Sequence, residues 1–254
     1  MGRIIAIANQ KGGVGKTTTA INLSACLAEA GKKVLTIDLD PQGNTTSGLG
    51  IDKDELENTV YELMLDECSI KESMKKTDIE NLTIIPANVN LAGAEIELLD
   101  VKEKEYVLKN SVDYIQDDFD FIIIDCPPSL NMLTINAMTT ADTVLVPIHC
   151  EGFKSKICAS GFDAAFLAIN KYILKKESVP KEKGLVNLFA PTTVSYADQK
   201  EMERMLHNIG VEVNYIPFYS SLEKIKRIPA AEASTSICKV FADEFMKTLW
   251  EDYE

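Results

Sequence analysis

The sequence predicts an α/β fold in which helices cover both faces of a twisted, mostly parallel sheet. Short apolar runs alternate with longer stretches whose apolar residues have helical spacing, and this alternation is typical of parallel strands joined through helices. The 254 residues, 46% of them hydrophobic, can also supply a full apolar core. The expected strands are residues 4–8, 34–37, 82–85, 121–124, 144–147, 185–189 and 213–216.

We expect one domain over residues 1–254, because no repeat, low-complexity segment or linker rich in Pro, Gly or Ser divides the chain. A glycine-rich segment that contains Lys11 begins close to Met1, so we expect no helix-turn-helix domain before it. Residues 237–254 have helical apolar spacing, with two basic against five acidic side chains. We therefore expect this segment to dock on the domain rather than to target a membrane.

The composition predicts a soluble, cytoplasmic protein. No apolar run approaches the roughly 20 residues that a membrane-spanning helix needs, and no charged-then-apolar leader is present. The six cysteines lack the spacing of metal ligands, so we interpret them as reduced thiols. With 26 basic and 39 acidic side chains the net charge is −13. This charge repels nucleic acid, so any contact with DNA requires a local basic patch.

The first expected strand, residues 4–8, runs into a glycine-rich turn and then into a helical segment. Such a turn directs backbone N–H groups and the helix N-terminus at one point, which makes an anion site. Lys16 is expected to reach the outer phosphates of ATP, and the Thr17 hydroxyl to hold Mg²⁺. The usual P-loop pattern has a glycine where this chain has Gln10, and a second lysine, Lys11, follows it. The residues expected to bind the nucleotide here are Gly12, Gly13, Val14, Gly15, Lys16, Thr17 and Thr18.

Acidic side chains follow the second and fourth expected strands. Because ligand sites collect at the carboxyl ends of parallel strands, Asp38, Asp40 and Asp125 are expected near the glycine-rich turn. Asp125 is placed to hold the metal ion through a water molecule, and Asp38 is expected either on the magnesium side or as a residue that supports the groups around the ion. Asp40 lies further beyond its strand and is expected to orient the attacking water. Two plainer interpretations remain: Asp125 caps the next helix, and Asp40 forms a turn before Pro41.

Four segments resemble the deviant Walker A family of P-loop ATPases, and most closely its ParA/Soj branch of partition ATPases. They are residues 9–18, 38–44, 91–98 and 121–129. The resemblance is strong over residues 1 to about 150 and loose over residues 151–254. It implies a single-domain P-loop NTPase fold for the chain.

The resemblance also implies an ATPase that forms a homodimer in its ATP-bound state. It assigns the catalytic aspartate to the position of Asp40. It places Lys11 on the partner's phosphates, so that two subunits enclose two ATP molecules. Adenine contacts are suggested for Asn187 and Pro217. A ParB-like partner with a basic N-terminal peptide would stimulate hydrolysis during chromosome or plasmid partition.

The carboxyl-terminal third departs from this branch where several Soj-like proteins carry DNA-binding arginines. Residues 190–194 and 216–221 contain no arginine. The basic run at residues 224–227 is either a substitute patch or a solvated helix face. We therefore expect non-specific binding of DNA to be weak.

Three functional interpretations stay open. The chain is a partition ATPase, a nucleotide-switched regulatory module, or a positioner of a protein cargo with little DNA binding. A role similar to that of the nitrogenase iron protein would need cysteines that bridge a cluster between subunits. Cys126 and Cys150 lie near the expected nucleotide site, and we interpret both as buried thiols.

Overall fold

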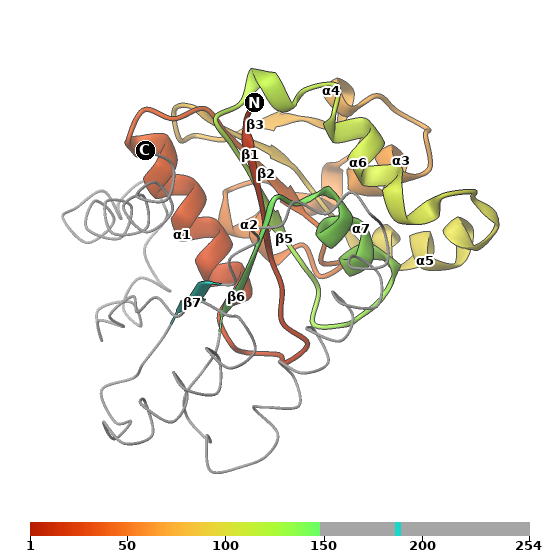
Figure 1. Cartoon of the computed structure of the whole chain (residues 1–254). Helices are drawn as coiled ribbons and strands as arrows, with labels where there is room; N and C mark the ends of the chain where they lie inside the picture. The colour runs from red at the N-terminus through yellow and green to blue at the C-terminus, as the bar shows by residue number, and fades with distance from the viewer. Residues whose placement is uncertain (148–185, 189–254) are drawn as a thin grey trace, which may run out of the picture.

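The described part of the chain is built around a seven-stranded sheet (Figure 1). The computed structural model describes residues 1–147 and 186–188, and the expected strand at 213–216 lies outside them. The strand order is β3-β4-β2-β5-β1-β6-β7, and every pairing except that of β3 with β4 is parallel. This arrangement confirms the predicted fold class. The strands are β1 Arg3–Ile7, β2 Val34–Asp38, β3 Lys75–Lys76, β4 Leu82–Ile85, β5 Phe121–Asp125, β6 Thr143–Pro147 and β7 Val186–Leu188.

Helices lie on both faces of the sheet, as Figure 1 shows for α1 on one face and for α3, α6 and α7 on the other. The helices are α1 Lys16–Glu29, α2 Asn44–Gly48, α3 Val60–Met64, α4 Ile70–Ser73, α5 Ala94–Glu97, α6 Val107–Val112 and α7 Met132–Thr140. Five 3₁₀ turns join them in the described residues: η1 Lys53–Glu55, η2 Val89–Gly93, η3 Leu98–Asp100, η4 Lys104–Tyr106 and η5 Gln116–Asp118. In residues 1–147 and 186–188, no helix combines the length and apolar character needed to cross a membrane.

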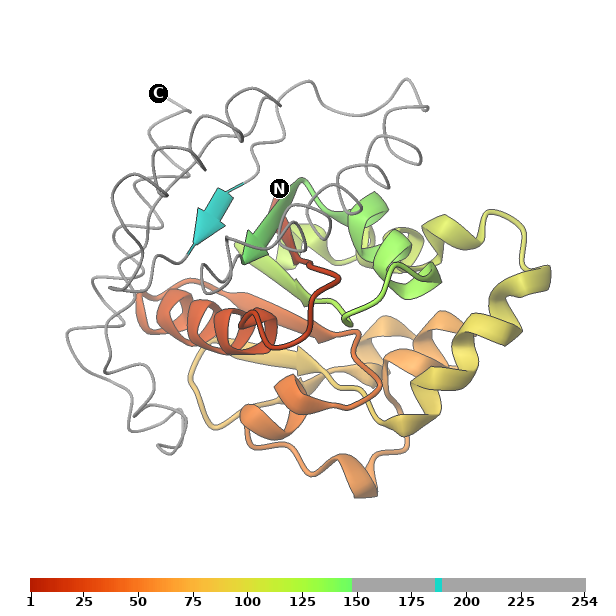
Figure 2. The ribbon, with the colours of Figure 1, turned by 90° about the horizontal axis from the view of Figure 1, so that it is seen from below.

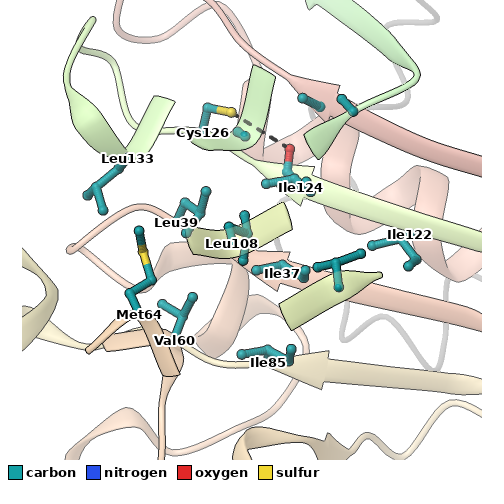
Figure 3. Packing of buried hydrophobic residues seen from close by; sticks show 14 of the residues in the cluster. Ile37, Leu39, Val60, Met64, Ile85, Leu108, Ile122, Ile124, Cys126 and Leu133 are labelled. Carbon is teal, nitrogen blue, oxygen red and sulfur yellow. Dashed lines mark hydrogen bonds between the residues drawn. The ribbon is translucent and has the colours of Figure 1, made fainter. Parts of the chain in front are cut away.

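Successive side chains of the central strands point to opposite faces of the sheet, and this alternation divides the core into two layers. Ile122 and Ile124 of β5 face the layer under α3, α6 and α7, whereas Phe121 and Ile123 face the layer under α1. Figure 3 shows the first layer, where Leu39, Val60, Met64, Leu108 and Leu133 gather against β2, β4 and β5. Burial on both faces explains why these strands are continuous apolar runs in the sequence.

The two-residue strand β3 was not among the expected strands. It consists of Lys75 and Lys76, pairs antiparallel with β4, and lies at the edge of the sheet. It carries no apolar signal because its side chains are not part of the core. Charged residues on a short edge strand also discourage pairing with another chain.

The register of the three central strands brings their carboxyl ends to one level. Ile7 of β1 pairs with Asp125 of β5, and Asp38 of β2 pairs with the same residue. The Cys126 N–H donates to the Ile7 carbonyl oxygen (3.1 Å), and the Leu39 N–H donates to that of Asp125 (2.9 Å). The loops that follow β1, β2 and β5 therefore begin side by side, as Figure 2 shows for the loops after β1 and β5.

Candidate nucleotide-binding site

The glycine-rich loop joins β1 to α1 through two left-handed backbone positions. Gly13 has φ +74° and Gly15, which caps α1, has φ +92°. Residues with a side chain rarely adopt these angles, so the turn requires glycine at both places. Lys16 is the first residue of the helix, and the first turn closes through the Thr19 N–H to the Gly15 carbonyl oxygen at 2.8 Å. The predicted sequence of strand, turn and helix N-terminus is present.

Asn9 fixes the entry to this loop, although the sequence analysis did not single it out. Its side-chain amide donates to the Pro147 carbonyl oxygen at the end of β6 (2.8 Å). Its carbonyl oxygen Oδ1 accepts from the Lys11 N–H (2.9 Å). The buried Asn9 thus ties the loop to the neighbouring strand. The sequence signal that could have identified Asn9 is its position as a polar residue directly after a buried strand.

The two lysines of the loop lie in different environments. Lys16 is buried, and its ammonium donates to the Lys11 carbonyl oxygen at 3.3 Å. Burial lowers the pKa of Lys16, although Asp125 and Asp40 oppose the shift by attracting its charge. An anion bound beside the Lys16 ammonium would stabilise its positive charge. Lys11 is partly buried and its backbone groups hold the loop together.

Asp125, at the end of β5, is fully buried, and its two carboxylate oxygens differ in their hydrogen bonds to the described residues. Its Oδ2 atom accepts from the hydroxyls of Thr17 (2.9 Å) and Thr45 (2.6 Å). Its Oδ1 atom accepts no hydrogen bond from the part of the chain that the structure describes. Burial, followed by the nearby charge of Asp38, raises the pKa of Asp125 to about 7. A carboxylate oxygen without a partner beside a threonine hydroxyl fits a hydrated Mg²⁺ ion, whose charge would favour the ionised form.

Asp38 has both carboxylate oxygens engaged with the protein. Its Oδ2 atom accepts from the Thr46 N–H (2.8 Å) and the Thr46 hydroxyl (2.7 Å), and Oδ1 accepts from the Asp40 N–H (3.1 Å). Burial raises the pKa of Asp38 to about 6, against the effect of these hydrogen bonds. The geometry therefore favours Asp38 as the residue that holds its loop.

Asp40 forms the turn that the plainer interpretation expects. Its Oδ1 atom accepts from the Gln42 N–H (2.9 Å), and its carbonyl oxygen accepts from the Gly43 N–H (2.8 Å). The side chain is 9% exposed, and its charge acts on both Lys16 and Asp125. Turn formation and proximity to the loop are thus both present at Asp40. Its catalytic role stays a prediction.

The remaining predicted residues divide between the described and undescribed parts of the chain. Asn187 lies in β7, opposite Val146 of β6. Pro217 and Cys150 lie outside the described residues. Cys126 is buried, and burial raises the pKa of its thiol, as expected for an inert core cysteine. Across residues 1–147 and 186–188, no cluster of three or more His, Cys, Asp or Glu side chains has the arrangement of a metal site.

Thr45 and Thr46 are two further functional candidates that the sequence analysis, as with Asn9, did not single out. Both lie in α2 and both are fully buried. Thr45 reaches Asp125, which is 80 positions away in the sequence, and Thr46 reaches Asp38. The short helix α2 thus joins the loop after β2 to the end of β5.

The raised pKa of Asp125 predicts a pH-dependent stability in the nucleotide-free protein. Between about pH 4 and 7 the folded state holds the proton more tightly than the unfolded chain, so stability falls as the pH rises. Relative to Asp125→Asn, we expect the wild type to lose on the order of 2 kcal/mol between about pH 5 and 7.5. Urea unfolding in EDTA measures the difference. A wild type that gains stability relative to the variant over this range would contradict the assignment.

A family model described as AAA domain matches residues 2–176. The chain belongs to this family. The sporulation initiation inhibitor protein Soj of Bacillus subtilis is 56% identical over 151 residues, which are 59% of this chain and 60% of the relative. The chromosome partitioning protein ParA of Myxococcus xanthus is 50% identical over 151 residues, 59% of this chain and 53% of the relative. These matches confirm the resemblance to the ParA/Soj branch over about 151 residues of the chain.

The chain covers no more than about 60% of the length of these curated relatives. The solved structure of cobyrinic acid a,c-diamide synthase from Mycobacterium smegmatis, with bound ADP and magnesium, is similar over more of the chain. It is 34% identical with a TM-score of 0.81, and the match covers 100% of this chain and 97% of that one. The AAA-domain fold is therefore shared with a protein that holds ADP and magnesium.

A second family model, described as nitrogenase component 1 type oxidoreductase, matches residues 114–254. The two matches overlap at residues 114–176. Within the overlap, β5 pairs with β1 and β2, and β6 pairs with β1. Up to Pro147, the described residues are thus an integral part of the AAA-domain sheet. The rest of the second match, apart from β7, lies outside the described residues, and the single domain over 1–254 stays a prediction.

Proposed function

We propose that the chain is a Mg²⁺-dependent ATPase. The observation that carries the proposal is the buried Asp125 carboxylate: its Oδ2 atom accepts from Thr17 at the start of α1, and its Oδ1 atom accepts no hydrogen bond within residues 1–147 and 186–188. A polar atom that is buried without a partner is costly unless a ligand completes it. Its place beside the glycine-rich loop favours a metal ion bound together with a phosphate chain.

Each residue of the site has a separate task in hydrolysis. The N–H groups of the glycine-rich loop and the Lys16 ammonium would bind the β- and γ-phosphates. Thr17 would contact Mg²⁺, and Asp125 would hold it through a water molecule. The ion, when bound, neutralises the charge that develops on the phosphates. Asp40 would orient the attacking water and accept its proton.

Lys11 extends the proposal to a homodimer in the ATP-bound state. Lys16 already supplies a cation to the phosphates of its own subunit, so Lys11 is proposed to reach the phosphates of a second copy. A cation supplied in trans stabilises transition-state charge as an arginine finger does. ATP would then join the two subunits, and hydrolysis would release them.

We further propose a role in chromosome or plasmid partition, with a ParB-like partner whose basic N-terminal peptide stimulates hydrolysis. The names of the relatives Soj and ParA support this role. The net charge of −13 suits a basic peptide and opposes strong binding to DNA. Non-specific DNA binding by the dimer is therefore proposed to be weak, with a shallow dependence on salt.

A second candidate is an ATP-switched module that positions or regulates a protein partner without DNA. The absence of arginine from residues 190–194 and 216–221 favours it. So does the match of residues 114–254 to a family other than the partition proteins. Release of phosphate from ATP, with and without Mg²⁺, tests the activity that both candidates share. Adding duplex DNA separates them, because stimulation by DNA would favour the partition role.

A further inference from the structure

Thr46 occupies a junction between three segments that are distant in the sequence. Its hydroxyl donates to Asp38 Oδ2 at the end of β2 (2.7 Å) and accepts from the Ala87 N–H beyond β4 (2.9 Å). Its own N–H donates to the same carboxylate oxygen (2.8 Å). Thr46, Asp38 and Ala87 are all fully buried. One hydroxyl therefore serves as donor and acceptor in a place that water does not reach.

The junction fixes the loop that carries Asp40. Asp38 holds Thr46 on one carboxylate oxygen and the Asp40 N–H on the other. The loop also packs closely on the Ala87 peptide, since a Cβ at Gly43 would lie 2.7 Å from the Ala87 carbonyl oxygen. The position of the Asp40 backbone thus depends on the Asp38 carboxylate, whose orientation Thr46 sets.

We infer that Thr46 is a positioning residue for Asp40. The inference rests on the proposed ATPase function. Within the described residues, the Thr46 hydroxyl bonds to Asp38 and Ala87 and not to the glycine-rich loop, so its task is separate from phosphate binding. Loss of the hydroxyl would remove the hydrogen bonds to the Ala87 N–H and to Asp38 Oδ2. The loop would then no longer hold Asp40 in one place. A displacement of about 1 Å in a catalytic group can lower a rate about 100-fold.

The test compares Thr46→Val, which keeps the shape and removes the hydroxyl, with Thr46→Ser, which keeps the hydroxyl. In Thr46→Val we expect kcat for ATP to fall about 10- to 100-fold while KM changes less than about threefold. In Thr46→Ser we expect kcat within about threefold of the wild type. Thr36→Val is the matched control, because Thr36 is equally buried in β2 and its hydroxyl bonds to Ser24 (2.8 Å) away from the site.

Hydrogen exchange in the nucleotide-free protein gives a second readout. The Ala87 amide should exchange about 10-fold faster or more in Thr46→Val than in Thr36→Val, and Thr46→Ser should retain its protection. If Thr46→Val and Thr36→Val have the same kcat, or if Thr46→Ser fails to restore it, the inference is wrong. If the wild type itself releases no phosphate, the proposed ATPase function fails instead, and the Ala87 exchange still decides whether Thr46 anchors the loop.

Discussion

Asp40→Asn is expected to lower kcat for ATP by about 100-fold or more, because an amide neither accepts the proton of the attacking water nor attracts it as strongly. Binding of ATP should change less than about threefold, since the glycine-rich loop and Lys16 are untouched. The substitution keeps an oxygen that can accept from the Gln42 N–H, so the turn is retained. Single-turnover hydrolysis and an equilibrium binding titration measure the two effects separately.

Asp52→Asn provides the control for this change. Asp52 accepts from the N–H of Asp54, two residues on, as Asp40 does from Gln42. It is exposed and caps a 3₁₀ turn outside the candidate site. We expect Asp52→Asn to hydrolyse ATP at the wild-type rate. An Asp40→Asn protein within about threefold of that rate would show that another group orients the water.

Lys11→Ala is expected to abolish ATP-dependent dimerisation and to leave nucleotide binding in place. The variant keeps the Lys11 N–H and carbonyl oxygen, which hold Asn9 and Lys16. It removes the cation proposed to reach the partner's triphosphate. Size-exclusion chromatography with saturating ATP, in an Asp40→Asn background that prevents turnover, measures the dimer.

Lys33→Ala is the matched control, because Lys33 is exposed and precedes β2, at the opposite end of that strand from Asp38. Its dimer should equal that of the Asp40→Asn parent. If Lys11→Ala dimerises as fully as this control, Lys11 does not join the subunits. If neither protein dimerises with ATP, the proposed cycle of assembly and release is wrong.

The sheet could be predicted from the sequence because its strands are buried on both faces. The runs at residues 4–8, 34–37, 82–85 and 121–124 differ from the observed strands by at most one residue at either end. Continuous burial leaves an apolar signal that needs no knowledge of the partner strand. β3 has no such signal because Lys75 and Lys76 lie at an edge, and its pairing depends on β4 alone.

The sequence predicts which loops form the site, but not the role of each side chain in it. That Asp38, Asp40 and Asp125 lie near the glycine-rich loop follows from their place after parallel strands. The task of each oxygen does not follow, because the deciding partners come from other segments. Thr45 and Thr46 look like ordinary residues of a helix start, yet they engage Asp125 and Asp38. For the same reason the sequence does not reveal that the Asp38 oxygens hold Thr46 and the Asp40 N–H, and its place on the magnesium side stays a prediction.

Release of inorganic phosphate by the full chain is the most direct test of the central claim, that the loops after β1, β2 and β5 form one site for magnesium and ATP. With radiolabelled ATP and Mg²⁺, we predict release that exceeds that of Asp40→Asn and stops when EDTA removes the ion. No release above the Asp40→Asn value, or release that continues at the same rate in EDTA, would contradict the account.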